Sequence, residues 1–560
     1  AAEMRERIEA SLAAEAADHP ENHALARQLI LFSNASISTL HSFCQSIIRR
    51  NFMAIDLDPQ FRLANEQELR LLQQDVLEDI FEAEYENGTP EFLSFANEYS
   101  SVRGDAPLHE LVLQLYHYAQ SMPFPADWLS SLSKPFQLPV GTKLEDTPWM
   151  PVIRLDIERV LAAARNTFQG LGALAMDSGC DAYVPDLQQD AAIIESLQET
   201  IKEFDWDRAY TAFNGLKFSK LHASKADDAA KKPVQEQRKA AIKYVADLSE
   251  KYFQETSAEL LDDLRAVYPV MHCLCQLTQH FADAFATVKR EKCLADFDDL
   301  EHFALQILCT EESTPTQLIP SSVALALQEK YEEVMVDEFQ DVNGVQQAIL
   351  SLITRQKVPN LFVVGDVKQS IYRFRLADPS LFLHMYQEYA KGMGGGKRIL
   401  LSQNFRSRDA VLQAVNFIFA QIMVPETMEI SYDEAAALHA GMKYPDSAGA
   451  AIMNETVELD LIDCDDQEAS DESAASESEE SAEELQGFAL EAQHIANRLR
   501  AMMDSRIVVF DKQANGYRPV QWRDMVVLLR SVKGKAMILL EALRTNHIPA
   551  YASVDAGYFE

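Results

Sequence analysis

Apolar residues recur at three- and four-residue spacing along much of the first half of the chain, which is the period of an amphipathic helix. The pattern is clear over residues 1–12, 66–81 and 244–285. Prolines interrupt it, but alternating or continuous apolar runs are few between residues 53 and 290. The sequence therefore predicts a large, mostly helical region over 53–290.

The second half of the chain contains short continuous apolar runs that end in polar residues. Such runs lie at 334–336, 361–364 and 399–401, and their length is typical of buried parallel strands. We predict further helices at 411–423, 488–503 and 537–546, and further strands at 457–462, within 520–530 and at 548–552. The predicted fold class is α/β.

The first of these runs, Val334-Met-Val336, leads directly into Asp337 and Glu338. A buried strand that ends in this way brings two carboxylates to the edge of a sheet. There, one carboxylate can hold Mg²⁺ and the other can orient or deprotonate a water that attacks a γ-phosphate. A surface turn after an ordinary core strand would look similar, so this junction alone leaves both interpretations open.

Two further junctions follow in order. Leu361-Phe-Val-Val-Gly-Asp366 continues into a polar and aromatic segment, and 399–407 is an apolar run that ends in Asn-Phe-Arg-Ser. Three junctions of this kind resemble motifs II, III and IV of superfamily 1 DNA helicases of the UvrD/Rep type. The sequence of residues 365–382 is most similar to that of AddA-type members, which are the helicase/nuclease subunits of AddAB complexes. RecB-type chains usually have a different sequence there.

The resemblance implies a domain organisation that the pattern alone does not give. It consists of two RecA-like P-loop NTPase-type domains, both incomplete in this chain, with a large, mostly helical insertion (1B) in the first. The first domain is expected at 1–52 and 291–392, the insertion at 53–290, and the second domain at 393–560.

The same resemblance assigns roles in ATP hydrolysis. Asp337 and Glu338 are the metal-binding carboxylates, and Glu338 also orients or activates the attacking water. Gln369 senses the γ-phosphate, Arg406 acts as an arginine finger from the second domain, and Phe405 stacks on the adenine. ATP and Mg²⁺ are the cofactors that these roles imply.

A single DNA strand requires aromatic stacking platforms and positive charge. Tyr372, Phe374 and Arg375 supply both within four residues. The UvrD family often has Trp at the position of Phe374, and Phe still stacks. Ordinary core packing of the two rings after a strand is the alternative interpretation.

Residues 35–50 resemble motif Ib of the family. There, Thr39 and His41 would face DNA phosphate or connect the DNA and ATP sites. The alternative is an ordinary helix N-cap formed by Ser38 or Thr39.

The net charge of −37 is unusual for a protein that binds DNA. Residues 463–484 contain 11 acidic and no basic residues, so we predict a disordered acidic insertion at about 463–485. Residues 217–243, in contrast, carry a net positive charge, with eight Lys or Arg and three acidic residues. This stretch either contacts DNA phosphate or forms a solvated helix and loop. Overall charge argues only weakly against DNA, because a local basic groove would suffice.

The seven scattered cysteines contain no CxxC pair, which indicates buried free thiols in a reducing cytoplasm. No run of 18 or more apolar residues and no signal peptide is found. We therefore predict a cytoplasmic protein without a membrane partner.

A phosphate-binding P-loop, GxxxxGK[ST], has no match in the sequence. The nearest string runs from Gly392 to Arg398, but its spacing is one residue short and Arg398 replaces the Mg²⁺-binding hydroxyl. We interpret it as a flexible connection between the two motor domains. The chain is thus expected to be an internal fragment that does not hydrolyse ATP by itself.

The resemblance implies that the full-length parent is an ATP-dependent 3′–5′ DNA helicase with exonuclease activity, which processes double-strand breaks for recombinational repair. Its expected partners are single-stranded and duplex DNA ends and an AddB-type subunit in a heterodimer. One alternative is a RecB- or UvrD-like helicase without nuclease. An alternative of another class is a non-catalytic DNA-binding scaffold with a degenerate motor, against which the intact motif residues argue.

Overall fold

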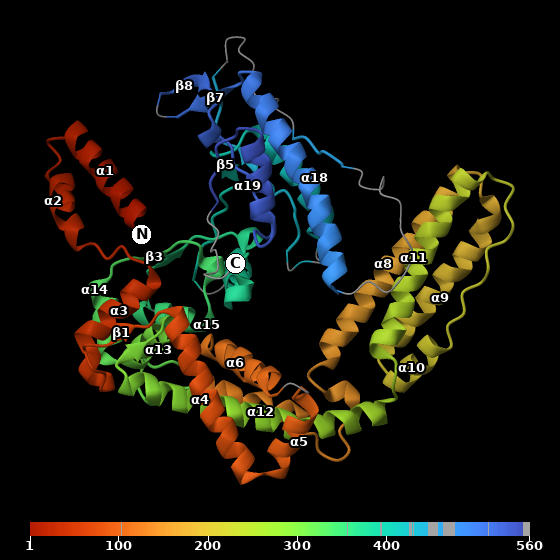
Figure 1. Cartoon of the computed structure of the whole chain (residues 1–560), viewed down its shortest axis with the longest axis horizontal. Helices are drawn as coiled ribbons and strands as arrows, with labels where there is room; N and C mark the ends of the chain where they lie inside the picture. The colour runs from red at the N-terminus through yellow and green to blue at the C-terminus, as the bar shows by residue number, and fades with distance from the viewer. Residues whose placement is uncertain are drawn as a thin grey trace. The chain divides into compact units, whose positions relative to one another are not determined.

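The computed structural model describes residues 1–101, 104–355, 357–392, 395–424, 428, 430–445, 457–462, 477–512 and 514–552 (Figure 1). The chain divides into two compact units, Ala1–Arg398 and Ile399–Glu560. Helices dominate both units, and the strands are few and short. The predicted α/β class is therefore confirmed only in part, because most of the described residues are helical.

The first unit begins with α1 (Ala2–Asp18), α2 (His23–Leu31) and α3 (Leu40–Asn51). The helix predicted over 1–12 forms as α1, yet neither α1 nor α2 buries a residue. In contrast, α3 buries Cys44, Ile47 and Ile48. The N-terminal segment is thus anchored to the core through α3.

The region 53–290 is helical, as predicted. In order it contains β1 (Arg62–Leu63), α4 (Glu66–Asn87), α5 (Pro90–Tyr99), α6 (Ala106–Gln120), α7 (Pro125–Leu132), α8 (Met150–Asp177), α9 (Val184–Glu203), α10 (Trp206–Asn214), α11 (Asp228–Tyr252) and α12 (Ser257–Glu291). The continuous apolar period over 244–285 is divided between α11 and α12. Thr256 causes the division, because its hydroxyl and the Glu259 carboxylate form a capping box that starts α12.

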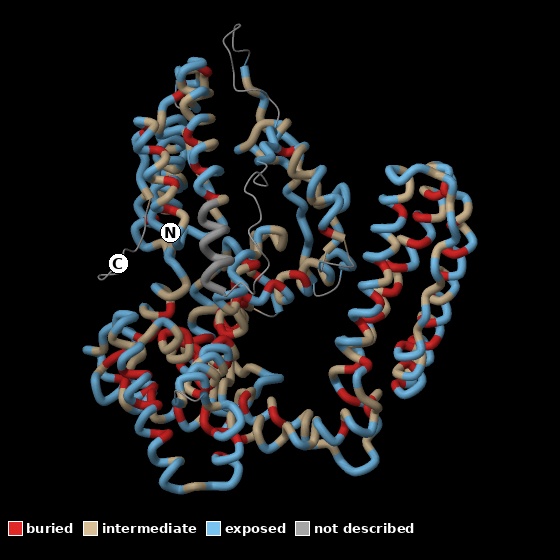
Figure 2. Tube along the Cα trace, turned by 45° about the vertical axis from the view of Figure 1, so that its right-hand side comes forward, coloured by how far each residue is buried: buried red, intermediate tan, exposed pale blue. Residues whose placement is uncertain are grey.

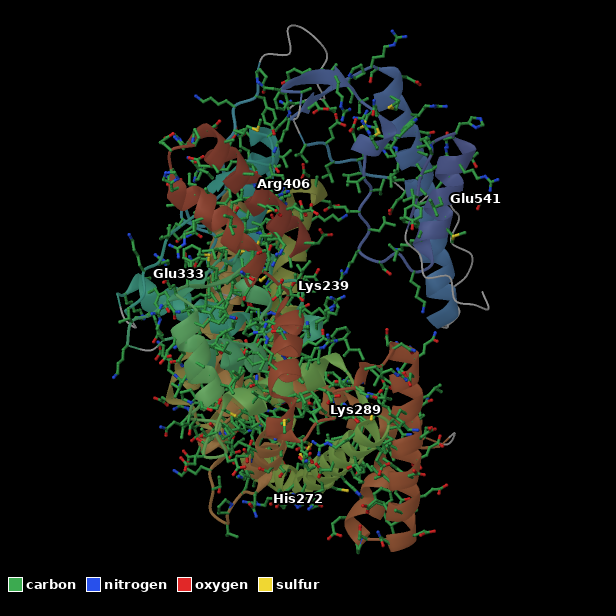
Figure 3. All side chains as sticks on the ribbon, turned by 90° about the vertical axis from the view of Figure 1, so that its left-hand side faces the viewer. Lys239, His272, Lys289, Glu333, Arg406 and Glu541 are labelled. Carbon is green, nitrogen blue, oxygen red and sulfur yellow. The ribbon has the colours of Figure 1, made fainter. Side chains whose placement is uncertain are left out.

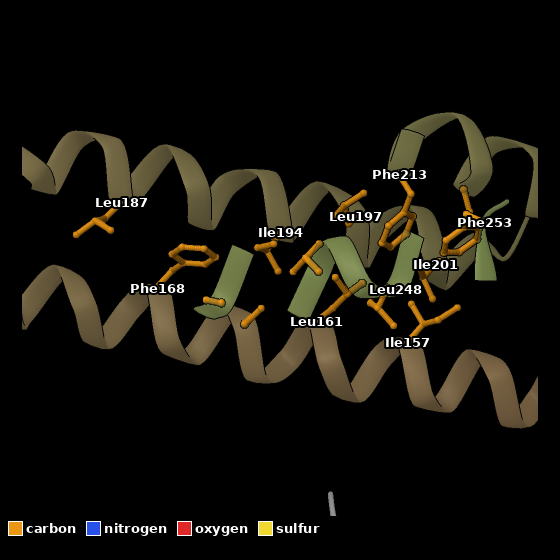
Figure 4. Close-up of a cluster of buried hydrophobic side chains, with 14 of the residues drawn as sticks. Ile157, Leu161, Phe168, Leu187, Ile194, Leu197, Ile201, Phe213, Leu248 and Phe253 are labelled. Carbon is orange, nitrogen blue, oxygen red and sulfur yellow. The ribbon is translucent and has the colours of Figure 1, made fainter. Parts of the chain in front are cut away.

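Helices α8, α9 and α11 pack along one another around their own core (Figure 4). Their buried side chains include Ile157, Leu161, Phe168, Leu187, Ile194, Leu197, Ile201 and Leu248. Burial of each such side chain contributes about 1.5–3 kcal/mol. A second core joins α4, α5 and α6 to α12, and buried positions recur along α12 (Figure 2).

A third core of the first unit lies under α3, α13 (Phe297–Leu308), α14 (Ser322–Lys330), α15 (Gly344–Ile353) and α16 (Pro379–Ala390). The short strand β2 (Leu294–Ala295) contributes Leu294 to the second core. The third core also holds β3 (Val334–Val336) and β4 (Leu361–Val363), which pair in parallel with Val334 opposite Leu361. Val334, Val336 and Val363 face this core.

The expectation that these strands are fully buried is wrong. Side chains alternate along a strand, so Met335 and Phe362 lie on the opposite face, where Met335 is 73% exposed. In the part of the chain that the structure describes, the sheet has two strands and a core on one face only.

The second unit contains the three predicted helices, as α17 (Asp409–Ile422), α18 (Glu477–Asp504) and α19 (Lys535–Thr545). The third junction contains β5 (Gln403–Asn404), which pairs in parallel with β6 (His439–Ala440). An antiparallel pair, β7 (Val508–Asp511) with β8 (Gly516–Pro519), was not predicted. Phe488, Ala492, Leu539 and Leu543 form the core between α18 and α19.

The strands predicted at 399–401, 457–462, within 520–530 and at 548–552 are not formed. In 525–529, Val527 and Leu529 pack against the α18–α19 core, while Val526 and Leu528 are exposed. Packed and exposed side chains thus alternate as in a strand, but the segment does not pair with another strand. Residues 463–476 of the predicted acidic insertion lie outside the described residues. Residues 477–485 are the first residues of α18 as its bounds are given, and disorder over 463–485 stays a prediction.

No helix among the described residues is both long and apolar enough to cross a membrane. The cysteines within the same residues are free, and Cys44, Cys180, Cys273 and Cys275 are buried, as predicted. Burial raises the pKa of Cys44 to about 12, so its thiol stays protonated.

Candidate functional site

Two loops of the first unit meet at one edge of the β3–β4 pair. Because the strands are parallel, the residues that follow them emerge side by side: Asp337 and Glu338 after β3, and Gly365 and Asp366 after β4. The two loops are joined directly, since the Phe339 N–H donates to the Val364 carbonyl at 2.9 Å. The structure thus brings the first two junctions together at one edge of the pair.

Gln340 holds the two loops together through its side chain. It is 1% exposed; its Nε2 donates to Glu338 Oε2 at 2.7 Å, and its Oε1 accepts the Asp366 N–H at 2.9 Å. A buried amide that uses both ends in this way fixes Glu338 relative to the next loop. Gln340 was not among the predicted site residues, although it lies within the Asp337–Asp341 tract.

Gly365 permits the close approach of these loops. A Cβ placed on Gly365 would lie 2.8 Å from Gln340 Oε1 and 3.2 Å from the Gln340 backbone nitrogen. Any larger residue would therefore displace the Gln340 side chain from Glu338. A glycine between an apolar strand and an aspartate is the sequence signal for such an approach.

Asp366 fixes the side chain of Gln369. Its carboxylate accepts from Gln369 Nε2 at 2.9 Å and pairs with Lys368 Nζ at 2.8 Å. Gln369 is itself exposed. Its amide is therefore oriented at the surface of the same loop cluster that carries Glu338.

The donor set at this edge is suited to a divalent cation. Asp337 and Glu338 are exposed carboxylates, and neither forms an ion pair with a basic residue in the described part of the chain. Nearby, burial and the charge of Glu338 raise the pKa of Asp341. Mg²⁺ usually takes one or two carboxylates together with waters and phosphate oxygens, so the uncompensated negative charge here fits that ion.

Tyr372, Phe374 and Arg375 form an exposed cluster on the segment that follows Gln369. The two rings lie 5.9 Å apart, and the Arg375 guanidinium lies 5.1 Å from the Tyr372 ring and 5.5 Å from the Phe374 ring. Tyr372 is 37% and Phe374 75% exposed. Core packing, the alternative interpretation, is therefore wrong for both rings.

Thr39 and His41 lie at the start of α3. Thr39 is the N-cap: its Oγ1 accepts the Ser42 N–H at 3.3 Å. The capping interpretation is therefore confirmed for Thr39, and its hydroxyl is already engaged. His41 is half-buried, with its ring edge against Phe297 at 5.1 Å.

The Asp-Phe-Asp-Asp segment at the start of α13 surrounds a buried ammonium. Lys289 Nζ, at the end of α12, donates to Asp296 at 2.7 Å and to Asp299 at 2.8 Å (Figure 3). Burial disfavours the ammonium, but the two carboxylates more than offset this and raise the pKa of Lys289. Burial and the neighbouring acids raise the pKa of Asp298 to about 7. The cluster ties α12 to α13.

Phe405 and Arg406 belong to the second unit, so their approach to Asp337 and Glu338 is not part of the described geometry. Both side chains are exposed, and Figure 3 labels Arg406. Asn404 Oδ1 accepts the Arg406 N–H at 2.9 Å and so fixes the turn after β5. A Cβ on Gly441 would lie 2.7 Å from the Phe405 ring, so that ring rests on the Gly441 backbone.

The basic stretch 217–243 lies in the loop before α11 and on α11. Lys217, Lys220, Lys225, Lys232, Lys239 and Lys243 are exposed. Arg238 is not available for DNA, because it pairs with the fully buried Asp190 at 2.7 Å and with the Ser219 carbonyl. The charge reversal thus consists mainly of exposed lysines.

The chain matches the family model of the UvrD/REP helicase N-terminal domain over residues 1–390. It is 40% identical over 577 residues to the A-type ATP-dependent helicase/nuclease subunit of Desulforamulus reducens, across 100% of the chain and 46% of that relative. The corresponding protein of Pelotomaculum thermopropionicum is 39% identical with the same coverage, and that of Bacillus pumilus is 38% identical over 100% of the chain and 45% of the relative. The chain thus spans less than half the length of these curated relatives.

Proposed function

The chain belongs to the UvrD/REP helicase family, and on that basis we propose that a full-length protein containing it is an ATP-dependent DNA helicase and nuclease subunit of the AddA type. One observation supports the motor function most strongly. Gln340 and Asp366 join the Asp337–Glu338 loop to the Gln369 loop through direct hydrogen bonds. Two acidic residues and an amide held together at a sheet edge are suited to phosphoryl transfer.

In this proposal, Asp337 and Glu338 hold Mg²⁺, which when bound would neutralise charge on the ATP phosphates. Glu338 orients the attacking water and accepts its proton. Gln369, held by Asp366, hydrogen-bonds the γ-phosphate. Arg406 supplies the stabilising cation from the second unit, and the exposed ring of Phe405 stacks on the adenine.

The same proposal gives the chain two RecA-like domains. The first comprises 1–52 and 291–392, the second 393–560, and the helices of 53–290 are an insertion in the first. The parallel β3–β4 pair and the compact unit from Ile399 onward support this arrangement. In this proposal, ATP hydrolysis drives movement of the protein along one DNA strand.

DNA would be held by the exposed Tyr372, Phe374 and Arg375 cluster, with His41 at a phosphate. Bases stack on exposed rings, and a guanidinium between them adds positive charge. Thr39 would contribute through the α3 terminus that it caps. The relatives are named as helicase/nuclease subunits, and that name supports further proposals: an exonuclease activity, and an AddB-type partner with which the protein processes duplex DNA ends.

The experiment that tests the proposed function is DNA unwinding by the full-length protein. Two duplexes are compared, one with a 3′ and one with a 5′ single-stranded tail, and strand separation is followed by fluorescence. We expect ATP-dependent unwinding of the 3′-tailed duplex and little of the other. Unwinding of neither duplex, or of the 5′-tailed duplex alone, would contradict the proposal.

The substitution Phe374→Ala should weaken binding of single-stranded DNA by about 1–3 kcal/mol, because a base that stacks on the ring loses its platform. Affinity is measured by fluorescence anisotropy with an oligothymidylate. Phe417→Ala is the matched control, since Phe417 is exposed to a similar extent on α17 of the second unit. Equal affinities of the Phe374→Ala and wild-type proteins would remove Phe374 from the DNA site.

A further inference from the structure

Glu301 is a buried carboxylate on the apolar face of α13. It is 3% exposed, and donors from two other helices surround it: His41 Nε2 at 3.1 Å, Gln346 Nε2 at 2.7 Å and Asn343 Nδ2 at 3.2 Å. An unpaired buried carboxylate is strongly unfavourable. The three donors therefore compensate the buried negative charge of Glu301. An apolar residue at this position would carry no charge and would need no such donors.

The donors come from the two segments that matter to the proposed reaction. His41 lies in the first turn of α3. Asn343 is the N-cap of α15, where its Oδ1 accepts the Gln346 N–H at 2.8 Å. Helix α15 follows the Asp337–Asp341 loop directly. Glu301 thus connects His41 to the end of the loop that carries the catalytic carboxylates.

We propose that Glu301 is a positioning residue, which orients His41 toward a DNA phosphate and links that contact to the segment carrying Asp337 and Glu338. This inference rests on the proposed function, because it takes His41 as a DNA contact. Binding of a phosphate to His41 would change its bond to Glu301, and Asn343 and Gln346 would transmit that change to the start of α15. The proposal therefore gives DNA a physical route to the ATP site.

The electrostatics of the pair agree with this geometry. The hydrogen bond to Glu301 raises the pKa of His41 above 6.5, against the opposing effect of burial, and the charges of Glu301 and Asp298 add to it. Burial would raise the pKa of Glu301, but the bonds from His41 and Gln346 lower it. These two acids come from α13, which packs on α3; η2 (Phe52–Ile55), also in contact with α3, has no titratable side chain.

The sign of the pH dependence follows from the raised pKa. Protonated His41 attracts phosphate, so its contribution to DNA binding is complete at low pH and is lost as pH rises through the raised pKa. The substitution Glu301→Gln removes the negative charge that raises the pKa of His41. The variant should therefore lose this contribution at a lower pH than the wild-type protein does.

The test is made on the full-length protein with Glu301→Gln. Affinity for an oligothymidylate is measured by anisotropy from pH 5.5 to 8.5, and ATP hydrolysis is measured with and without that DNA. We expect the midpoint of the affinity profile to move to lower pH, and stimulation of hydrolysis by DNA to fall by about 5-fold or more. An unchanged profile and unchanged stimulation in a folded variant would overturn the proposal.

Two controls separate positioning from general damage. Asp190→Asn also neutralises a fully buried, paired carboxylate, but within the α8–α11 bundle, so it should leave the pH midpoint in place. His41 is half-buried, and His41→Gln should remove the pH dependence that His41 gives to DNA affinity. This expectation holds whether or not Glu301→Gln folds. The double variant should equal His41→Gln alone, since Glu301 acts through His41; additive effects would refute the route.

The same data distinguish this inference from the proposed function. A wild-type protein that binds DNA with the expected pH profile but does not hydrolyse ATP would contradict the proposed function. The shift of the midpoint between the wild-type and Glu301→Gln proteins would still decide whether Glu301 positions His41.

Discussion

The full-length protein with Glu338→Gln is expected to lose ATP hydrolysis by about 100- to 10,000-fold, the usual contribution of a positioned general base. Glutamine retains an oxygen that can accept from Gln340 Nε2, so the link between the two loops is kept. It cannot accept a proton from water. Steady-state phosphate release measures the effect, and affinity for single-stranded DNA should remain at the wild-type value because Glu338 lies outside the aromatic cluster.

Glu333→Gln is the matched control for this prediction. Glu333 is an exposed carboxylate just before β3, so its substitution removes the same charge from the same segment (Figure 3). The control should hydrolyse ATP at the wild-type rate. If Glu338→Gln also turned over at that rate, the assignment of Glu338 would be wrong.

The second large effect is expected for Arg406→Ala, which should slow hydrolysis by about 10³- to 10⁵-fold. An arginine finger stabilises charge on the transferred phosphoryl group, and its loss is of this order. The Arg406 side chain has no protein partner within the described residues, so its removal should not destabilise the second unit. Single-turnover hydrolysis at saturating ATP isolates the chemical step from nucleotide binding.

Arg408→Ala serves as the control two residues away. Its guanidinium lies 4.3 Å from the Tyr444 ring and donates to Tyr517 Oη, so it is engaged within the second unit. We expect hydrolysis within about 3-fold of wild type for this variant, corresponding to less than 1 kcal/mol. Equal losses in both variants would mean that Arg406 acts on the fold and not on the phosphoryl group.

The sequence predicted local features well because their causes are local. Helices α17, α18 and α19 follow from apolar spacing, and the Asp337–Glu338 and Gly365–Asp366 junctions follow from runs that end in polar residues. The start of α12 could also have been predicted, since Thr256 and Glu259 have capping-box spacing.

Features that depend on distant partners were not predicted. A strand needs a neighbour to pair with, and residues 525–529 have the alternation of a strand while packing as an extended segment on α18 and α19. Glu301 was missed because its donors, His41 and Gln346, are far from it in sequence. The signal was present, however: an acidic residue on the apolar face of α13.

The measurement that tests the central claim most directly is steady-state ATP hydrolysis by the full-length protein, with and without single-stranded DNA. We propose that this chain carries the carboxylates and DNA contacts of a working motor, and we therefore expect Mg²⁺-dependent hydrolysis that rises when DNA is added. Tight DNA binding without any hydrolysis would contradict this proposal and would instead support a non-catalytic DNA-binding scaffold.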